Sequence, residues 1–228
     1  MRIGAVIVGR LGSRRLPGKV LREVAGRPLL EYVVARLTRV RGLDAIVVAT
    51  SQEPGDDPIV AWAAARELAV YRGPRDDVLG RVIEAARAHR LDAVARVNAD
   101  SPWLDPDLLT AAIARMRAER PDLVTNLVAR RWPYGVSAEV ATVAALARAH
   151  AAADADDREH VTRRLYAQPE AFDTVALSSS EDAGSDVRLV VDTEDDLRSF
   201  ERLVDTLGSR ALDAPTTVVV AAARALSD

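Results

Sequence analysis

Short apolar runs alternate along the chain with longer stretches in which apolar positions recur at helical spacing. Three runs rich in valine, isoleucine and alanine lie at residues 3–8, 44–50 and 92–98. Runs of this length and composition predict buried strands of a parallel sheet. The stretches between and after them predict helices over residues 28–37, 57–68 and 76–89. Strands that alternate with helices indicate an α/β fold with a mostly parallel, doubly wound and twisted sheet.

The second half of the chain repeats these patterns less regularly. Asp105-Pro106 is typical of a helix start, and Thr193 followed by Asp196 is typical of another. The further predicted elements are strands over 122–126, 136–143 and 187–191, and helices over 105–116, from 144 to about 153, and over 158–167. No repeat or low-complexity linker divides the sequence. We therefore expect a single domain over residues 1–228, with an inserted segment at about 128–170.

The composition is that of a globular chain. Its 228 residues carry a formal net charge of −3, with 49% hydrophobic and 29% charged residues, which excludes a disordered, collagen-like or nucleic-acid-coating protein. Cysteine is absent, which excludes disulfides, thiolate nucleophiles and zinc–cysteine sites. The apolar runs 1–8 and 218–223 are shorter than a signal-peptide core or the roughly 20 residues of a membrane span. We therefore expect a cytoplasmic protein.

Charge is distributed unevenly along the chain. Residues 1–41 contain ten basic and two acidic side chains, whereas residues 181–228 contain five basic and eleven acidic ones. An anionic ligand is expected near the first segment, and a divalent cation could join the two segments; the alternative is that both are solvated helix faces. Lysine occurs once, at Lys19, and the other 30 of the 31 basic residues are arginine. A lysine retained in so arginine-rich a chain indicates a specific role.

The loop at residues 9–19, with the sequence GRLGSRRLPGK, follows the first predicted strand. Its three glycines allow backbone N–H groups to approach phosphate oxygens, and its four cations neutralise phosphate charge. The spacing fits neither common phosphate loop, because five residues separate Gly12 from Gly18, Val20 follows Lys19, and the later glycine of the dinucleotide fingerprint is missing. From composition alone, a phosphate site and an ordinary exposed turn both remain open.

A longer series of motifs resembles one protein family. GRLGSRRLPGKVL at residues 9–21 resembles the signature loop of the cytidylyltransferases that activate acidic sugars. Further motifs match in the same order: ATS (49–51), DDPIV (56–60), RGPRDDVLGR (72–81), RVNADSP (96–102), DREHVT (157–162) and RLVVDTEDDL (188–197). Together they span nearly the whole chain to about residue 205. The sequence is thus similar to the acylneuraminate and 3-deoxy-manno-octulosonate (KDO) cytidylyltransferases, most closely to their SpsF-like branch.

The resemblance implies a GT-A-like nucleotidyltransferase with a three-layer α/β sandwich. Such an enzyme transfers CMP from CTP to an acidic sugar or similar acidic acceptor and releases pyrophosphate, as a step of surface-glycan biosynthesis. The resemblance also implies a Mg²⁺ cofactor and a homodimer that assembles through the inserted segment. No nucleic-acid partner is expected, because the basic residues of the N-terminal segment are divided between a glycine loop and a helix and are offset elsewhere. The short apolar runs likewise predict no membrane partner.

The resemblance also assigns site residues by motif position. The nucleotide would be bound by Arg10, Leu11, Gly12, Ser13, Arg15, Lys19, Thr50, Arg72, Asp77, Asn98 and Ala99. Lys19, Arg15 and Asp100 would be catalytic, and Asp100 and Asp192 would bind Mg²⁺. Glu139, Arg158, Glu159 and His160 would lie toward the acceptor.

Both proposed metal ligands also have a physical argument. Asp100 and Asp192 each end a predicted strand, so they can project into one crevice, where Mg²⁺ takes a few carboxylates together with phosphate oxygens. The structural alternatives are a turn before Pro102 for Asp100 and a neighbour of the helix cap at Thr193 for Asp192.

The sequence departs from the family pattern in three places. The family usually has Gln-Ala where this chain has Val8-Gly9, and it often has Thr-Gly-Asp-Cys-Pro at residues 98–102. Its Asp-Gly-x-Asp-x-Glu segment corresponds to residues 134–139, where Glu139 is the one acidic group retained. Two alternatives therefore remain: a GT-A glycosyltransferase, for which Asp105-Pro106-Asp107 supplies a D-x-D pattern, and an inactive nucleotide-binding protein.

Overall fold

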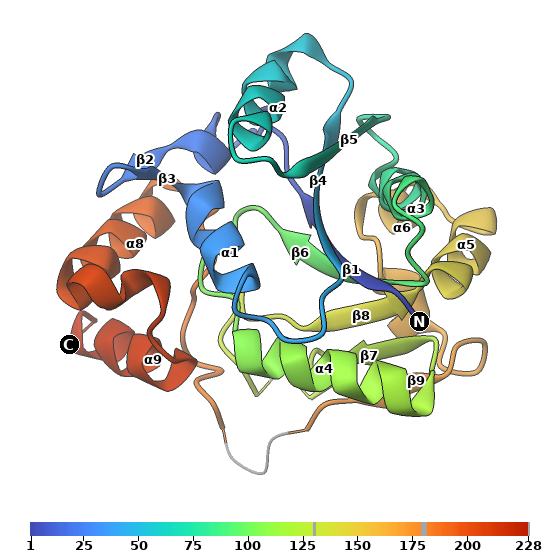
Figure 1. Ribbon diagram of the computed structural model, residues 1–228. Helices are drawn as coiled ribbons and strands as arrows, with labels where there is room; N and C mark the ends of the chain where they lie inside the picture. The colour runs from blue at the N-terminus through green and yellow to red at the C-terminus, as the bar shows by residue number, and fades with distance from the viewer. Residues whose placement is uncertain (130, 179–181, 228) are drawn as a thin grey trace.

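A seven-stranded sheet forms the centre of the protein (Figure 1). The computed structural model describes residues 1–129, 131–178 and 182–227. In spatial order the strands are β5 (Ala69–Gly73), β4 (Ala45–Ser51), β1 (Ile3–Val8), β6 (Ala93–Asn98), β8 (Glu139–Thr142), β7 (Leu123–Thr125) and β9 (Thr174–Ala176). β8 pairs antiparallel with β6 and β7, whereas the other pairs within this sheet are parallel. The predicted mostly parallel α/β sheet is confirmed.

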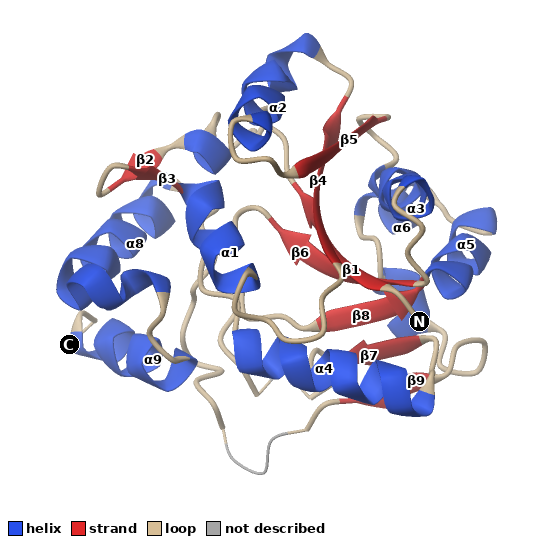
Figure 2. Ribbon diagram, in the orientation of Figure 1, coloured by secondary structure: helices blue, strands red, loops and turns tan. Residues whose placement is uncertain are grey.

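Helices cover both faces of the sheet and make three layers (Figure 2). Successive residues of β1 point to opposite faces, so Ile3, Ala5 and Ile7 pack in one core and Val6 packs in the other. The first core includes side chains of α1 (Leu29–Leu37), α2 (Asp57–Ala64) and α4 (Pro106–Glu119). The second includes side chains of α3 (Val78–Ala88) and α5 (Val143–Ala151). The predicted sandwich is therefore confirmed.

A third core attaches the C-terminal helices beside the sheet. It contains side chains of α8 (Glu194–Leu207), η3 (Gly208–Leu212) and α9 (Thr216–Ala225), together with Leu16, Trp103 and the extended segment 187–191. The predicted start of α8 is confirmed: the Thr193 hydroxyl accepts from the Asp196 N–H, and the Asp196 carboxylate accepts from the Thr193 N–H. This packing fixes residues 187–193 next to the first loop of the chain.

Two sequence predictions of secondary structure are wrong. Residues 187–191 do not form a strand of the sheet, because they pack on α8 and Trp103; the one described bridge joins Arg188 to Tyr134. The helix predicted over 158–167 is two short helices, α6 (Ala155–Glu159) and α7 (Arg163–Ala167). The chain between them turns inward and buries Val161 and Thr162.

The sequence patterns also miss several short elements. These are the edge strands β5 and β9, the hairpin of β2 (Glu23–Val24) and β3 (Arg27–Pro28), helix α9, and the single-turn helices η1 (Lys19–Leu21) and η2 (Pro54–Asp56). Strands of two to five residues carry too little periodicity to be recognised. Among the helices of the described residues, none has the length and apolar character needed to cross a membrane.

The segment at 128–170, predicted as an insertion, contains β8, α5, α6 and α7. Residue 130 lies outside the described residues. β8 is the antiparallel strand between β6 and β7, so this segment completes the central sheet and also brings α6 to the carboxyl end of β6.

Candidate active site

A crevice of about 790 Å³ opens at the carboxyl ends of β1 and β6. Its walls come from loop 9–19, from the residues around the start of α3, and from the end of α6. Open parallel sheets bind ligands at this edge, because the loops that leave neighbouring strands diverge there. The crevice therefore lies where the sequence predicts a ligand site.

Loop 9–19 is held in shape by its own backbone and by a buried carboxylate. The Gly18 N–H donates to the Leu11 carbonyl at 2.9 Å, and Gly18 has φ 73°, a conformation that favours glycine. The Leu11 N–H donates to Asp56 Oδ1 at 2.7 Å, and the Ser51 hydroxyl donates to Asp56 Oδ2. Burial raises the pKa of Asp56, but these donors outweigh burial and hold the pKa below its ordinary value. The loop is thus preorganised.

Lys19 joins the two carboxylates that the sequence assigns to a metal. Lys19 is the first residue of η1, directly after Gly18, and is only 7% exposed. Its Nζ donates to Asp100 Oδ2 at 2.6 Å and to Asp192 Oδ1 at 2.7 Å. The second oxygen of Asp100, Oδ1, is buried and has no hydrogen-bond partner among the described residues. A buried oxygen left in this way is costly unless a ligand satisfies it.

Asp192 reaches this position through backbone and side-chain contacts. The N–H of Val191 donates to the Asp100 carbonyl at 2.9 Å and fixes the segment beside the end of β6. The guanidinium groups of Arg15 and Arg188 each lie 3.2 Å from Asp192 Oδ2. Burial raises the pKa of Asp192, but the hydrogen bond and charge of Lys19, with these arginines, hold the pKa below its ordinary value.

The crevice has a positive balance of charge. Among its described lining residues, seven cations face five carboxylates: Arg10, Arg14, Arg15, Lys19, Arg75, Arg81 and Arg96 against Asp76, Asp100, Asp156, Glu159 and Asp192. A built Cβ at Gly12 would meet no atom within 4 Å, so this part of the loop faces open space. A cationic crevice beside an open glycine loop suits a polyanion such as a triphosphate.

A second cavity of about 340 Å³ adjoins the crevice. Its lining includes hydroxyl, amide and aromatic side chains: Asn98, Ser101, Asn126, Trp132, Tyr134, Ser137 and Tyr166. Arg96, Asn98 and His160 line both cavities. Two adjoining cavities can hold two reactants, with the shared wall marking where they meet.

The structure brings most of the sequence-predicted site residues together. The crevice is lined by Arg10, Gly12, Ser13, Arg15, Lys19, Asn98, Ala99, Asp100, Asp192, Glu159 and His160. Leu11 belongs to the same loop, but its side chain packs against the first core. Glu139 lines the second cavity but is only 1% exposed; it accepts the Thr162 hydroxyl and pairs with Arg96.

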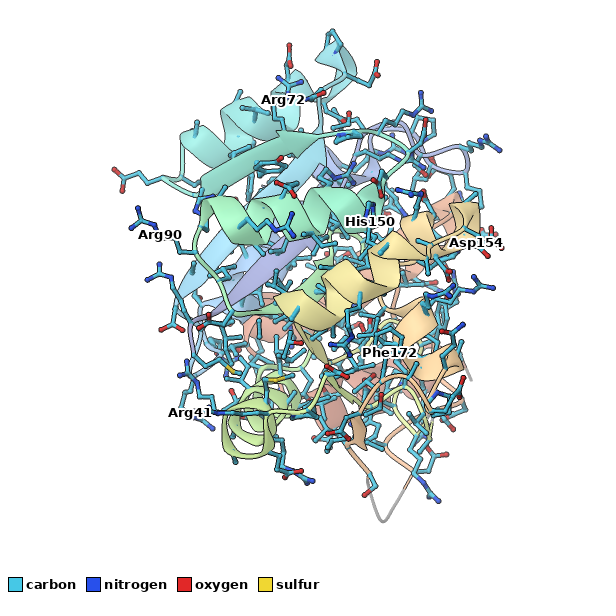
Figure 3. All side chains as sticks on the ribbon, turned by 90° about the vertical axis from the view of Figure 1, so that its right-hand side faces the viewer. Arg41, Arg72, Arg90, His150, Asp154 and Phe172 are labelled. Atoms are coloured by element: carbon cyan, nitrogen blue, oxygen red, sulfur yellow. The ribbon has the colours of Figure 1, made fainter. Side chains whose placement is uncertain are left out.

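Besides Leu11, four predicted residues do not line either cavity. Thr50 is fully buried. Arg72, labelled in Figure 3, pairs with Asp57 at 2.7 Å and donates to the Ser51 carbonyl at 3.0 Å. Asp77 caps α3 by accepting from the Gly80 N–H.

Asp77 also accepts from the fourth residue, Arg158, at 3.0 Å. The Asp77 carboxylate lies 2.8 Å from Nε2 of His150 on α5, which is labelled in Figure 3. These contacts tie α3, α5 and α6 together behind the crevice. His150, which has no supporting motif in the sequence, thus belongs to this cluster.

Sequence reasoning missed three residues of the site. Asp56 lies in the DDPIV motif and accepts a hydrogen bond from loop 9–19. It was missed because a carboxylate at the start of a predicted helix is typical of a helix cap. Arg81 lies in the RGPRDDVLGR motif and is 2% exposed; it donates to the Pro74 carbonyl at 2.9 Å and lines the crevice. Arg96 opens the RVNADSP motif, and its place on β6 turns it toward both cavities. An arginine within a β-branched strand is the signal that could have indicated it.

Comparison with known proteins identifies the family of this chain. A family model described as cytidylyltransferase matches residues 5–216. The chain is 31% identical to the spore coat polysaccharide biosynthesis protein SpsF of Bacillus subtilis, over 90% of this chain and 87% of that protein. It is 39% identical to a 3-deoxy-manno-octulosonate cytidylyltransferase of Anaeromyxobacter dehalogenans over 120 residues, which are 51% of this chain and 48% of the relative.

The fold is also similar to that of a solved structure. A cytidylyltransferase from Leptospira borgpetersenii superposes with a TM-score of 0.92 at 24% identity, over 100% of this chain and 95% of that one. At this identity the likeness establishes the fold, while the family model and the relative that matches nearly the full length establish the family. The chain belongs to the cytidylyltransferase family of nucleotidyltransferases, in its SpsF-like branch.

Proposed function

We propose that this protein transfers CMP from CTP to an acidic sugar or similar acidic acceptor and releases pyrophosphate, in a Mg²⁺-dependent reaction of polysaccharide biosynthesis. One observation carries the proposal: the Lys19 ammonium and the carboxylates of Asp100 and Asp192 converge in a cationic crevice at the ends of the parallel strands. The family and the names of the relatives support the nucleotide and the acceptor class.

The donor set fits a magnesium ion. Two carboxylates from distant parts of the chain share one cation at present, the Lys19 ammonium, and Asp100 Oδ1 is buried without a partner among the described residues. Among the described residues, no group of three or more acidic or histidine side chains is arranged to hold a metal by itself. Asp100 and Asp192 would thus hold Mg²⁺ with phosphate oxygens and water, and bound Mg²⁺ would polarise the α-phosphate.

The chain's own residues would do the rest by positioning and charge. Phosphate oxygens would approach the backbone of loop 9–19 at Gly12. Arg10, Arg15 and Lys19 would neutralise the charge of the departing pyrophosphate. Lys19 would have to exchange its carboxylate partners for phosphate oxygens when the nucleotide enters. The acceptor would lie in the second cavity, where Asn98 and His160 border the crevice.

A pyrophosphate-release assay tests the proposal. The four ribonucleoside triphosphates are each incubated with Mg²⁺ and a panel of acidic acceptors that includes KDO. We expect pyrophosphate from CTP with at least one acidic acceptor, and loss of at least about 100-fold of the rate in Asp100→Asn. CTP binding without turnover across the panel would favour an inactive nucleotide-binding protein instead.

The glycosyltransferase alternative has less support. Its D-x-D pattern forms the start of α4, where Asp105 accepts from the backbone N–H groups of Asp107 and Leu108, both at 2.9 Å. Release of UDP from UDP-sugars, with no pyrophosphate from CTP, would establish it.

A cytoplasmic homodimer formed through residues 128–170 is part of the proposal, and light scattering on the purified protein tests the dimer.

A further inference from the structure

Among the described residues that line both cavities, Arg96 is the one strongly basic side chain. Arg96 and Asn98 lie two residues apart on β6 and so point to the same side of the sheet, while His160 reaches the wall from the end of α6. A group that moves from a ligand in the crevice to a ligand in the second cavity must pass this wall. If one reactant occupies each cavity, the residues of this wall would lie next to the reacting atoms of both.

Arg96 is paired with the buried carboxylate of Glu139. β6 and β8 are antiparallel and Ala95 is paired with Val140, which places Glu139 across from Arg96. Arg96 Nη1 lies 3.2 Å from Glu139 Oε2 in an ion pair without hydrogen-bond geometry, since this buried oxygen has no hydrogen-bond partner among the described residues. The other carboxylate oxygen, Oε1, accepts the Thr162 hydroxyl. Glu139 is only 1% exposed, so it has few alternative conformations. The pair therefore fixes where the guanidinium can lie.

The guanidinium retains unused donors. Arg96 Nε is buried and has no hydrogen-bond partner among the described residues, although a guanidinium has five N–H donors. A buried donor without a partner is costly, and a planar guanidinium is suited to binding a carboxylate or phosphate through two bonds. The ion pair with Glu139 thus leaves Arg96 incompletely satisfied, in a position that faces both cavities.

Charge in the two cavities distinguishes the possible partners. The crevice has six further lysine or arginine side chains in its described lining to face a triphosphate: Arg10, Arg14, Arg15, Lys19, Arg75 and Arg81. The second cavity has no lysine and no arginine other than Arg96 among its described lining residues. An acidic acceptor in the second cavity would therefore find its fixed positive charge at Arg96.

We propose that Arg96 binds the acidic group of the acceptor and that Glu139 positions the guanidinium for this contact. The inference rests on the proposed function, because it takes the second cavity as the acceptor site. It assigns Glu139 a role behind the site, as a positioning residue that acts through Arg96.

The test uses Arg96→Met, Arg96→Lys and Glu139→Gln, with KDO as the probe acceptor and, if KDO is not used, the acidic acceptor of the panel that gives the highest rate. Arg96→Met should raise the KM for the acceptor about 10- to 100-fold and leave the dissociation constant of CTP within about twofold. Arg96→Lys should recover part of the loss, because the charge remains but the paired donors do not. Arg14→Met is the converse variant: it removes an arginine that lines the crevice alone, so it should weaken CTP binding and leave the acceptor KM unchanged.

Glu139→Gln supplies a second readout if Arg96→Met does not fold. It should raise the acceptor KM and have no further effect in an Arg96→Lys background, since both residues then act through one contact. An unchanged acceptor KM in folded Arg96→Met, or a rise in the CTP dissociation constant alone, would overturn the role of Arg96 while the cytidylyltransferase activity stands. Failure of wild-type protein to use any acidic acceptor would overturn both.

Discussion

The Lys19 ammonium lies 2.7 Å from the Asp192 carboxylate, which is 173 residues away along the chain. Asp100 accepts from the same nitrogen at 2.6 Å, so the two carboxylates share this cation. Asp192 also pairs with Arg15 and Arg188. The basic N-terminal segment and the acidic C-terminal segment therefore meet at the single lysine of the sequence. A compact ammonium can lie between two carboxylates in the space that a metal ion would need.

Replacement of Lys19 by methionine should uncouple metal binding from nucleotide binding. Without the ammonium, Asp100 and Asp192 have lost the cation they share, so Lys19→Met should bind Mn²⁺ about tenfold or more tightly than wild type when CTP is absent. Electron paramagnetic resonance of free Mn²⁺ measures this binding. Adding Asp100→Asn should remove the gain, and equal Mn²⁺ affinity in wild type and Lys19→Met would contradict the exchange of partners proposed for Lys19.

Arginine should not replace lysine at this position. A planar guanidinium is broader than an ammonium and cannot place one nitrogen between Asp100 and Asp192, and Lys19 is nearly buried. We expect Lys19→Arg to lower kcat/KM for CTP about 100-fold in the pyrophosphate assay. Arg22→Lys is the control, because Arg22 is an exposed residue paired with Glu194 and the substitution exchanges the same two side-chain types nearby. This variant should keep nearly full activity. Comparable losses in both variants would argue against a specific need for lysine at position 19.

Gly9 and Ala99 should behave as one pair. A Cβ built at Gly9 lies 2.6 Å from the Ala99 Cβ, and the Ala99 N–H donates to the Val8 carbonyl at 3.0 Å, which keeps the two chains close. Gly9→Ala should therefore destabilise the protein by about 1–3 kcal/mol, and Ala99→Gly should restore most of that stability in the double variant. Thermal unfolding measures both.

Gly12→Ala is the matched control for this pair, since a Cβ there meets no atom within 4 Å and stability should change little. If the effects of Gly9→Ala and Ala99→Gly simply add, the contact does not account for the glycine.

Stability on the acid side should depend on Asp196. Burial raises the pKa of this carboxyl, but Arg188 and the backbone N–H of Asp192 outweigh burial and lower the pKa from 3.8 to about 2. A lowered folded-state pKa adds stability that is complete above the ordinary pKa and is lost as pH falls from about 4 to about 2. The lowered value corresponds to on the order of 2 kcal/mol, and the Asp196 side chain is only 12% exposed.

Thermal unfolding of wild type and Asp196→Asn from pH 7 to pH 2 measures this contribution. The wild type should be the more stable at pH 7, and the difference should shrink below about pH 4. Asp195→Asn, whose side chain is 87% exposed, is the control and should change little. A difference between wild type and Asp196→Asn that stays constant with pH would contradict the role of the Asp196 charge.

The sequence was sufficient to predict the parts of the fold and site that have long or local signals. The apolar runs predict β1, β4 and β6, and the Thr193 cap predicts the start of α8. Loop 9–19 is predicted as part of the site because glycines and cations gather in it. Asp100 is predicted from the end of its strand, and Asp192 from its motif, since the strand predicted before it does not form. All of these features depend on residues close together in sequence.

Contacts between distant residues could not be predicted. The ion pair between Lys19 and Asp192 depends on the packing of residues 187–191 against α8, which leaves this run outside the sheet despite its strand-like composition. Arg158 and Asp77 look like ligand contacts in their motifs, but tertiary structure pairs them with each other. The family's Ala and Gly are exchanged at Gly9 and Ala99, and only the 2.6 Å approach shows that these are one change of packing.

The most direct measurement follows the phosphates of CTP labelled separately at the α- and γ-positions. With Mg²⁺ and an acidic acceptor, wild-type protein should transfer the α-label to the acceptor and release the γ-label as pyrophosphate, and Asp100→Asn should do neither. Release of the γ-label as orthophosphate, or equal transfer by wild type and Asp100→Asn, would contradict CMP transfer at the site formed by Lys19, Asp100 and Asp192.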